Sequence, residues 1–149
     1  MTSAFDPAAL PYFAFGANLD EAEMAHRCPG ARSTGVARLP GWRFLTNCRG
    51  WGTIVPAPGC VVYGLLWQVT AADVASLDDY EGLPEGLYRR DQIEVFALDG
   101  RTVNAWAYFA TDSEPGPPQP GYLEQVSAAA ARLGLPAEYV AELRAGRTA

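Results

Sequence analysis

The stretch CVVYGLLWQV, residues 60–69, decides the predicted fold class. It is a nearly continuous apolar run rich in β-branched and aromatic residues, which is typical of a buried strand. Gly64 inside it predicts a bulge or a tight bend, the feature by which small sheets curl into barrels. Thr70 then predicts a capped helix that runs to about Glu81 and is ended by Gly82. A strand that leads directly into a helix indicates a mixed α and β domain.

Short strand-like runs lie on both sides of this stretch. Each is bounded by Gly, Pro or Asn, a pattern typical of antiparallel hairpins and meanders. The expected strands are residues 12–15, 35–39, 42–45, 53–55, 88–96 and 102–110. The expected helices are residues 20–27, 122–133 and 136–143, with a proline-rich loop at 111–121. We therefore expect one α+β domain over residues 1–149, with a mostly antiparallel, barrel-like sheet and a few short flanking helices.

The charge and hydropathy patterns exclude several classes of function. The formal net charge is −6 and no cluster of basic residues occurs, so we expect no nucleic-acid partner. No run approaches the roughly 18 apolar residues of a membrane span, and we expect no membrane partner. The N-terminal residues have neither the basic start nor the apolar run of a secretion signal, so the expected location is cytoplasmic.

Three cysteines and one histidine are the best candidates for soft metal ligands. Cys28, Cys48 and Cys60 have no C-x-x-C spacing, and His26 is the one histidine of the chain. Zinc sites need a closer cluster than this, so we expect no metal. We expect the three thiols to be buried or half-buried. His26 is expected at the surface of its helix.

An apolar strand stops at Gly16 in the segment FAFGANL, residues 13–19, and a capped helix begins soon after it. Such a corner directs unpaired backbone N–H groups at one point, and the helix dipole adds positive potential there. It suits a carboxylate or a developing oxyanion, and Gly16 and Ala17 leave room for a ligand to approach closely. The alternative is a tight strand-to-helix turn in which Asn18 forms a local hydrogen-bonding cap.

Three carboxylates fall in the last turn of the helix that follows the central strand. Asp78, Asp79 and Glu81 lie in SLDDYEG, residues 76–82, where the negative end of the helix dipole disfavours anions. Mutual repulsion and the helix end both raise a carboxyl pKa toward the range of a general acid or base near neutral pH. Glu81, next to Gly82, is best placed to face a pocket. The alternative is a solvated acidic helix end.

Four segments together resemble the gamma-glutamylcyclotransferase family. FAFGANL is similar to that family's YGSNL-type loop, with Phe15 in place of the usual Tyr and Ala17 in place of the usual Ser. SLDDYEGLPEGLYRR is similar to the segment that carries the family's catalytic glutamate and a following tyrosine. AWAYFAT and PQPGY continue the resemblance, which spans about residues 12–143 in the family's order.

This resemblance implies an enzyme that cleaves a γ-glutamyl amide without water and releases 5-oxoproline with a free amine or amino acid. It implies that Glu81 is the general acid and base, that no cofactor takes part, and that the partner is a small γ-glutamyl molecule. The residues expected to bind this substrate are Phe15, Gly16, Ala17, Asn18, Leu19, Tyr88, Tyr108 and Tyr122. The leaving amine and the oligomeric state are left open.

Other interpretations of the same residues remain open. Taken singly, Tyr88 and Tyr108 are typical of half-buried core tyrosines, and Arg38, Arg89 and Arg90 are typical of charges on strand surfaces. A second hypothesis is a binding module of the same fold that holds a γ-glutamyl or related molecule without turnover. A third is an acidic interaction domain, which requires the carboxylates at the helix end to be exposed.

Overall fold

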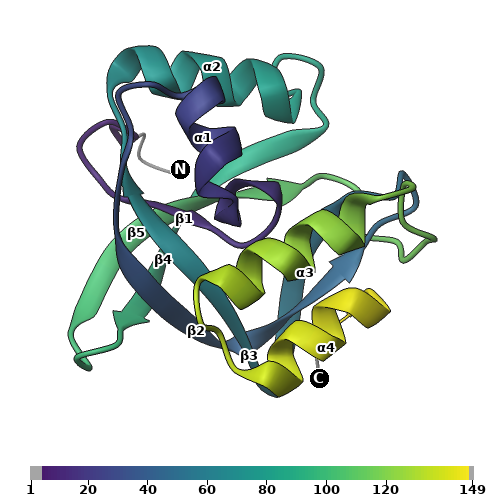
Figure 1. Ribbon diagram of the computed structural model, residues 1–149. Helices are drawn as coiled ribbons and strands as arrows, with labels where there is room; N and C mark the ends of the chain where they lie inside the picture. Colours follow the sequence, from purple (N-terminus) through teal and green to yellow (C-terminus); the bar gives the residue numbers. More distant parts are fainter. Residues whose placement is uncertain (1–4, 148–149) are drawn as a thin grey trace.

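Within residues 5–147, which the computed structural model describes, five strands close into a barrel in the order β1-β3-β2-β4-β5 (Figure 1). The strands are β1 (Tyr12–Ala14), β2 (Arg32–Thr46), β3 (Gly52–Gln68), β4 (Tyr88–Ala97) and β5 (Thr102–Ala110). All neighbouring pairs are antiparallel except β1 and β5, which pair in parallel at Tyr12 and Trp106. The predicted α+β class with a mostly antiparallel, barrel-like sheet is confirmed.

Five helical segments flank the barrel in the described part of the chain. They are the 3₁₀ helix η1 (Ala17–Leu19) and the α-helices α1 (Glu21–Arg27), α2 (Ala71–Glu81), α3 (Tyr122–Arg132) and α4 (Ala137–Ala145). Helix α2 lies across one end of the barrel with α1 beside it, and α3 and α4 pack side by side against the strands (Figure 1). The predicted helices and the irregular segment at 111–121 are thus confirmed. None of the helices in residues 5–147 has the length and hydropathy needed to cross a membrane.

The helix ends follow the local sequence closely. The Thr70 hydroxyl accepts a hydrogen bond from Asp73 N–H at 3.1 Å, and the Asp73 carboxylate accepts one from Thr70 N–H at 3.0 Å. Gly82 ends α2 in the left-handed conformation with φ of +73°. At α1 the Asp20 carboxylate accepts hydrogen bonds from two backbone N–H groups, and the Glu23 side chain forms an ion pair with Arg27, one turn later.

The long hairpin of β2 and β3 corrects the prediction of several short strands. Residues 35–39 and 42–45 belong to one continuous strand, as do residues 53–55 and 60–68. Between Pro40 and Trp42 the pairing steps from Val61 to Pro56, so glycines and prolines here mark ladder irregularities rather than turns. The strands continue past these irregularities because they pair on both sides of them.

Gly64 has a different role from the predicted bulge. It pairs in register with Ala37, and the register shifts of this ladder lie elsewhere. A Cβ at Gly64 would overlap the Ala14 carbonyl oxygen and would lie 2.6 and 2.7 Å from two ring carbons of Phe13. The missing side chain therefore lets β1 pack closely against β3.

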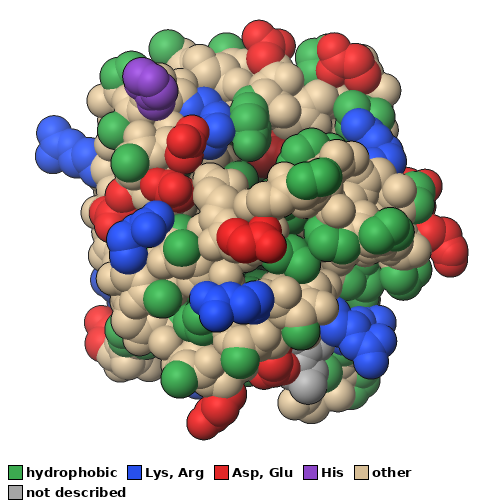
Figure 2. All heavy atoms as spheres, turned by 45° about the vertical axis from the view of Figure 1, so that its right-hand side comes forward, with side chains coloured by type: hydrophobic (Ala, Val, Ile, Leu, Met, Phe, Trp, Pro, Cys, Tyr) green, Lys and Arg blue, Asp and Glu red, His purple; other side chains and the backbone are tan. Residues whose placement is uncertain are grey.

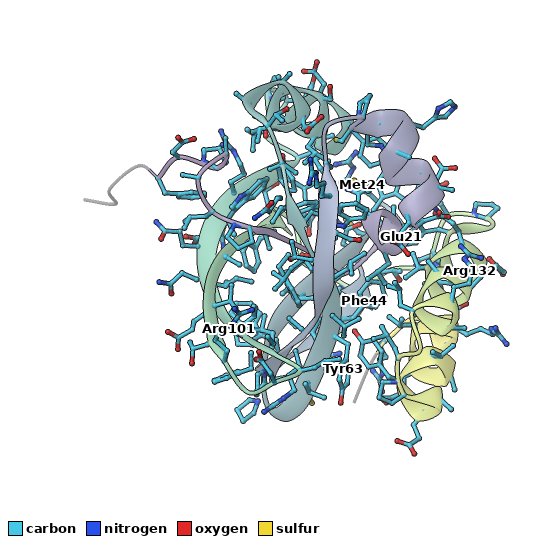
Figure 3. All side chains as sticks on the ribbon, turned by 60° about the vertical axis from the view of Figure 1, so that its left-hand side comes forward. Glu21, Met24, Phe44, Tyr63, Arg101 and Arg132 are labelled. Atoms are coloured by element: carbon cyan, nitrogen blue, oxygen red, sulfur yellow. The ribbon has the colours of Figure 1, made fainter. Side chains whose placement is uncertain are left out.

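Aromatic side chains fill much of the interior. Trp106 is fully buried and stacks on Tyr12, with 4.8 Å between the ring centroids. Trp67 is also buried, whereas Trp42 is half-buried and Trp51 is 39% exposed, as expected for a mixture of core and rim positions. Tyr63 points from β3 toward α4 (Figure 3), where its ring meets that of Tyr139 edge to face at 5.0 Å.

The thiols and the histidine fit the sequence prediction with one exception. Cys28 is buried and Cys60 is half-buried, but Cys48 is exposed. Cys48 lies in the turn between β2 and β3, where its thiol donates to Asp112 Oδ2 at 3.0 Å rather than entering the core. The histidine, His26, lies at the surface of α1 as expected (Figure 2).

Gly64→Ala is expected to lower the free energy of unfolding by about 1–3 kcal/mol, the usual cost of overpacking a dense core. The physical reason is the overlap of the new methyl group with Ala14 and Phe13. Urea unfolding gives the change. Ser33→Thr adds one methyl group at an exposed position of β2 and should stay within about 0.5 kcal/mol of wild type. A change of less than about 0.5 kcal/mol for Gly64→Ala as well would contradict the close packing of β1 on Gly64.

Candidate functional site

A cavity of about 390 Å³ opens where β1 passes into η1 and where α2 ends. It gathers segments that are far apart in the sequence, including the β2–β3 turn and the starts of β4 and α3. The predicted site residues that line it are Phe15, Gly16, Ala17, Asn18, Glu81, Tyr88, Tyr108 and Tyr122. The two sequence features singled out for chemistry therefore face the same space.

Leu19 is the one predicted site residue that does not line the cavity. Its side chain is buried in the hydrophobic core at 1% exposure. Its backbone N–H donates to the Gly16 carbonyl oxygen at 3.0 Å, so the turn itself uses this donor. Leu19 therefore anchors the turn and leaves ligand contact to the residues before it.

The turn of Gly16, Ala17 and Asn18, called the 16–18 turn below, presents backbone to the cavity. Ala17 and Asn18 are the first residues of η1, whose N–H groups have no carbonyl partner within the helix. A Cβ at Gly16 would lie 2.9 Å from the Tyr122 hydroxyl oxygen. Glycine is required there because the backbone approaches Tyr122 so closely.

Asn18 holds the 16–18 turn through contacts outside it. Its side-chain amide donates to the Tyr12 hydroxyl oxygen at 2.9 Å, and its Oδ1 accepts from Arg27 Nη1. Its backbone carbonyl accepts from Trp67 Nε1 at 3.1 Å. The alternative of a local cap at Asn18 is thus wrong, because every one of these partners lies six or more residues away.

Glu81, the last residue of α2, carries the ionisable group of interest. Burial raises the pKa of its carboxyl from 4.5 to about 7, and the positive charge of Arg27 limits the rise. The direction agrees with the sequence prediction, but the main cause is burial rather than repulsion among the neighbouring acids. A carboxyl with a pKa near 7 can both accept and release a proton at neutral pH.

The peptide of Gly52, at the start of β3, joins two of the predicted tyrosines. Gly52 N–H donates to the Tyr122 hydroxyl oxygen at 3.1 Å, and the Tyr88 hydroxyl donates to the Gly52 carbonyl at 2.8 Å. Burial is the main cause that raises the pKa of both phenols above the ordinary value. Both hydroxyls are therefore neutral, and the Tyr122 proton is free to donate into the cavity.

The third tyrosine is held by the acidic helix end. The Tyr108 hydroxyl donates to Asp78 Oδ1 at 2.7 Å, and Arg90 Nε lies 3.4 Å from the same oxygen. Asp78 therefore positions a cavity tyrosine, while Asp79 is exposed. Tyr88 and Tyr108 are buried more fully than the half-buried core interpretation expected, and both also line the cavity.

Three arginines on the strands lie away from the cavity. Arg38 and Arg89 are exposed on strands, and none of Arg38, Arg89 and Arg90 lines the cavity. Figure 2 shows basic, acidic and apolar side chains interspersed over one face of the molecule. The surface interpretation of Arg38 and Arg89 is confirmed, and Arg90 pairs with Asp78.

Sequence reasoning missed one wall of the cavity. The β2–β3 turn, residues 47–51, contributes Arg49 and Trp51, and Gly52 follows at the start of β3. Tyr12, which accepts the Asn18 hydrogen bond, also lines the cavity. The tetrapeptide RGWG at 49–52 was the available signal, but its place beside Glu81 depends on barrel closure.

Comparisons with known proteins agree on one group of relatives. Residues 61–143 match the model of the AIG2-like family. The chain is 33% identical over 144 residues to a gamma-glutamylcyclotransferase of Mus musculus, covering 90% of this chain and 77% of that protein. The corresponding protein of Homo sapiens is 32% identical over 150 residues, covering 94% and 80%. A solved structure described as a gamma-glutamyl cyclotransferase superposes with a TM-score of 0.83 at 31% identity, covering 92% of this chain and 87% of that one.

The raised pKa of Glu81 predicts a pH dependence of stability. Between pH 4.5 and about 7 the folded protein keeps a proton that the unfolded chain has lost, so the free energy of unfolding falls as pH rises through this window. Glu81→Gln removes this decline. Relative to wild type, the variant should therefore gain up to about 3 kcal/mol on going from pH 4.5 to pH 8.

Urea unfolding at a series of pH values measures this difference. Glu85→Gln is the matched control, because Glu85 is exposed at the same cavity and its variant should keep the wild-type decline. Parallel stability curves for wild type and Glu81→Gln would mean that the carboxyl is not desolvated in the folded state.

Proposed function

This chain belongs to the gamma-glutamylcyclotransferase family, and on that premise we propose that it converts a γ-glutamyl amide into 5-oxoproline and a free amine or amino acid. The observation that carries the proposal is the position of Glu81. Its carboxyl, with a pKa raised to about 7 by burial, faces the same enclosed cavity as the 16–18 turn. A proton-transfer group thus lies beside backbone N–H groups suited to an anionic oxygen.

The reaction is intramolecular and consumes no water. The α-amino nitrogen of the substrate attacks its own γ-carbonyl carbon, which forms a five-membered ring, and the bond from that carbon to the amide nitrogen breaks. Tethered reactants gain effective molarities on the order of 10⁵ M or more, so the substrate supplies its own nucleophile. The attacking nitrogen loses two protons as the α-ammonium group becomes the ring N–H, and the leaving nitrogen gains two as it departs as an ammonium ion. The protein must relay these protons and stabilise the carbonyl oxygen.

Glu81 is the group proposed to move these protons. It accepts one proton from the α-ammonium group, so that the free amine can attack, and donates it to the departing nitrogen as the C–N bond breaks. It then passes the second proton from the ring nitrogen to the released amine, so one carboxyl acts as base and as acid. Its pKa of about 7 makes both steps accessible near neutral pH.

The remaining polar groups of the cavity are proposed to bind the γ-glutamyl group. The 16–18 turn offers backbone N–H groups, and Tyr122 offers a hydroxyl proton that its Gly52 contact leaves free. Phe15 and Ala17 contribute no hydroxyl, so recognition in this part of the cavity relies on the backbone. Tyr88 and Tyr108 add neutral hydroxyls that are fixed by Gly52 and Asp78.

A binding module without turnover is the second hypothesis kept from the sequence. Phe15 and Ala17, which replace two hydroxyl residues of the family's loop, are the features that favour it. The acidic interaction domain is disfavoured, because Glu81 faces the cavity and Asp78 is engaged with Tyr108 and Arg90.

Glu81→Gln is expected to lower the rate of 5-oxoproline release from γ-glutamyl amides by at least about 10²-fold, since a positioned acid or base contributes roughly 10²–10⁴-fold. The amide keeps the shape of the side chain but cannot accept and return the proton. Product formation from a panel of γ-glutamyl amides is followed for wild type and variant.

The control for this change is Glu94→Gln, which makes the same substitution at an exposed position of β4 that does not line the cavity. Its rate should stay within about threefold of wild type, because exposed charges interact weakly with a site that is largely shielded from solvent. If neither wild type nor variant makes 5-oxoproline while a γ-glutamyl ligand raises the melting temperature, the binding module is correct.

The value of kcat/KM should fall about tenfold for each pH unit that the pH is lowered below 7, because only ionised Glu81 accepts the first proton. Arg27 lowers the pKa of Glu81, so Arg27→Gln should move this acid limb to higher pH. Initial rates at low substrate concentration between pH 5 and pH 8 measure the acid limb of wild type and of Arg27→Gln. An acid limb near pH 4.5 would show that the functional carboxyl is a solvated one.

A further inference from the structure

The cavity changes character from its closed end to its opening. The groups around the 16–18 turn are almost fully buried, with exposures of 2% for Asn18, 4% for Tyr12 and 9% for Tyr122. Two other residues that line the cavity are far more exposed, Trp51 at 39% and Tyr80 at 49%. The γ-glutamyl group, common to every substrate, fits the enclosed end, and the amine that leaves therefore faces the open end.

Two exposed aromatic rings border this open end. Trp51, Tyr80 and Leu98 are the large hydrophobic side chains exposed within the described residues, and the first two of them line the cavity. The Trp51 ring meets the Tyr122 ring edge to face at 5.2 Å, and the Arg27 guanidinium lies 3.5 Å from the centre of the Tyr80 ring. Both rings are thus held in place while a face or edge stays open to a ligand.

Arg49 adds a positive charge to the same rim. It is the arginine among the cavity residues, and no carboxylate in residues 5–147 lies within ion-pair distance of its guanidinium. Its backbone is fixed, because Arg49 N–H donates to Asn47 Oδ1 at 3.0 Å and the Gln119 side chain donates to the Arg49 carbonyl at 2.9 Å. The turn therefore fixes the backbone from which the Arg49 side chain reaches the cavity.

Other charges near this rim are acidic. Asp79 and Glu85 line the cavity and are exposed. The pKa of Asp112 is lowered first by its hydrogen bond from Cys48, with a smaller effect of Arg49, and Asp112 already accepts the Cys48 thiol. Arg49 can thus bind a carboxylate of a ligand. Asp79 and Glu85 instead favour a leaving amine with a positive charge, which is the alternative that the experiments below distinguish.

We propose that Arg49, Trp51 and Tyr80 form the subsite for the leaving group, and that it takes an amino acid with a free α-carboxylate and an aromatic or large apolar side chain. The carboxylate binds the Arg49 guanidinium, and the side chain packs against the two rings. This inference rests on the proposed function and names the class of amine released.

The first test compares γ-glutamylphenylalanine with γ-glutamylphenethylamide, which has the same ring but lacks the carboxylate. Wild type should have at least about a tenfold higher kcat/KM for the first compound, because a hydrogen bond to a charged group is worth about tenfold or more. Arg49→Gln should lower kcat/KM for γ-glutamylphenylalanine by about 10- to 100-fold, mainly through KM. The same variant should leave γ-glutamylphenethylamide within about twofold.

Two further variants separate charge from shape. Arg101→Gln makes the same substitution at an exposed arginine of the β4–β5 hairpin (Figure 3). This variant should leave kcat/KM unchanged for both phenyl compounds. Trp51→Ala should lower kcat/KM for both phenyl compounds and leave it unchanged for γ-glutamylalanine, because the variant loses the contact with the phenyl ring of the substrate.

Each other outcome overturns the proposal. Equal losses for both substrates in Arg49→Gln would assign the guanidinium to the carboxylate of the γ-glutamyl group. No loss would remove Arg49 from the site. A wild-type preference for γ-glutamylputrescine would assign the rim to a cationic amine through Asp79 and Glu85.

Failure of the proposed function is read separately. If no substrate yields 5-oxoproline, calorimetric titration of the same two phenyl compounds into Glu81→Gln, with and without Arg49→Gln, still compares their affinities. A carboxylate preference that disappears with Arg49→Gln supports the subsite in a protein without turnover, and equal affinities refute it.

Discussion

The short strand β1 is the constraint on which the site depends. Its antiparallel pairing with β3 and its parallel contact with β5 at Tyr12 close the barrel. The chain leaves β1 directly into the 16–18 turn, so barrel closure sets the position of that turn. Gly64 permits the close packing of β1, and Asn18 ties the turn back to Tyr12 and Trp67 on the flanking strands. The position of the turn is therefore set mainly by tertiary contacts with these strands.

The same closure creates the electrostatic balance at Glu81. Removing water from a carboxylate disfavours its charge, and the cation of Arg27 opposes this effect at the cavity. Arg27 is itself held by Asn18, by Glu23 and by the face of the Tyr80 ring. A change at the turn would therefore reach the carboxyl through Arg27. The Glu81 carboxyl and the 16–18 turn are thus joined through one network of contacts.

Local signals in the sequence explain what could be predicted. Thr70 and Gly82 fix where α2 begins and ends, and this places Glu81 at the helix end. Where glycine or proline has two possible roles, local sequence does not decide between them, as at Gly64. Arg49 could not be assigned to the site, because its turn is fixed by contacts such as the one from Asn47 Nδ2 to the Asp112 carbonyl, 65 residues away. Residues joined only by barrel closure leave no short-range pattern.

The enclosed end and the rim of the cavity are under different constraints. Gly52 belongs to the enclosed end, because its peptide binds the hydroxyls of Tyr88 and Tyr122, and a Cβ there would lie 2.6 Å from a ring carbon of Phe44. Arg49, three residues earlier, makes its described hydrogen bonds through the backbone, so its side chain can change without disturbing the turn. The Arg49 side chain can therefore vary without altering the Gly52 peptide that orients the two tyrosines, so the rim and the enclosed end can change independently.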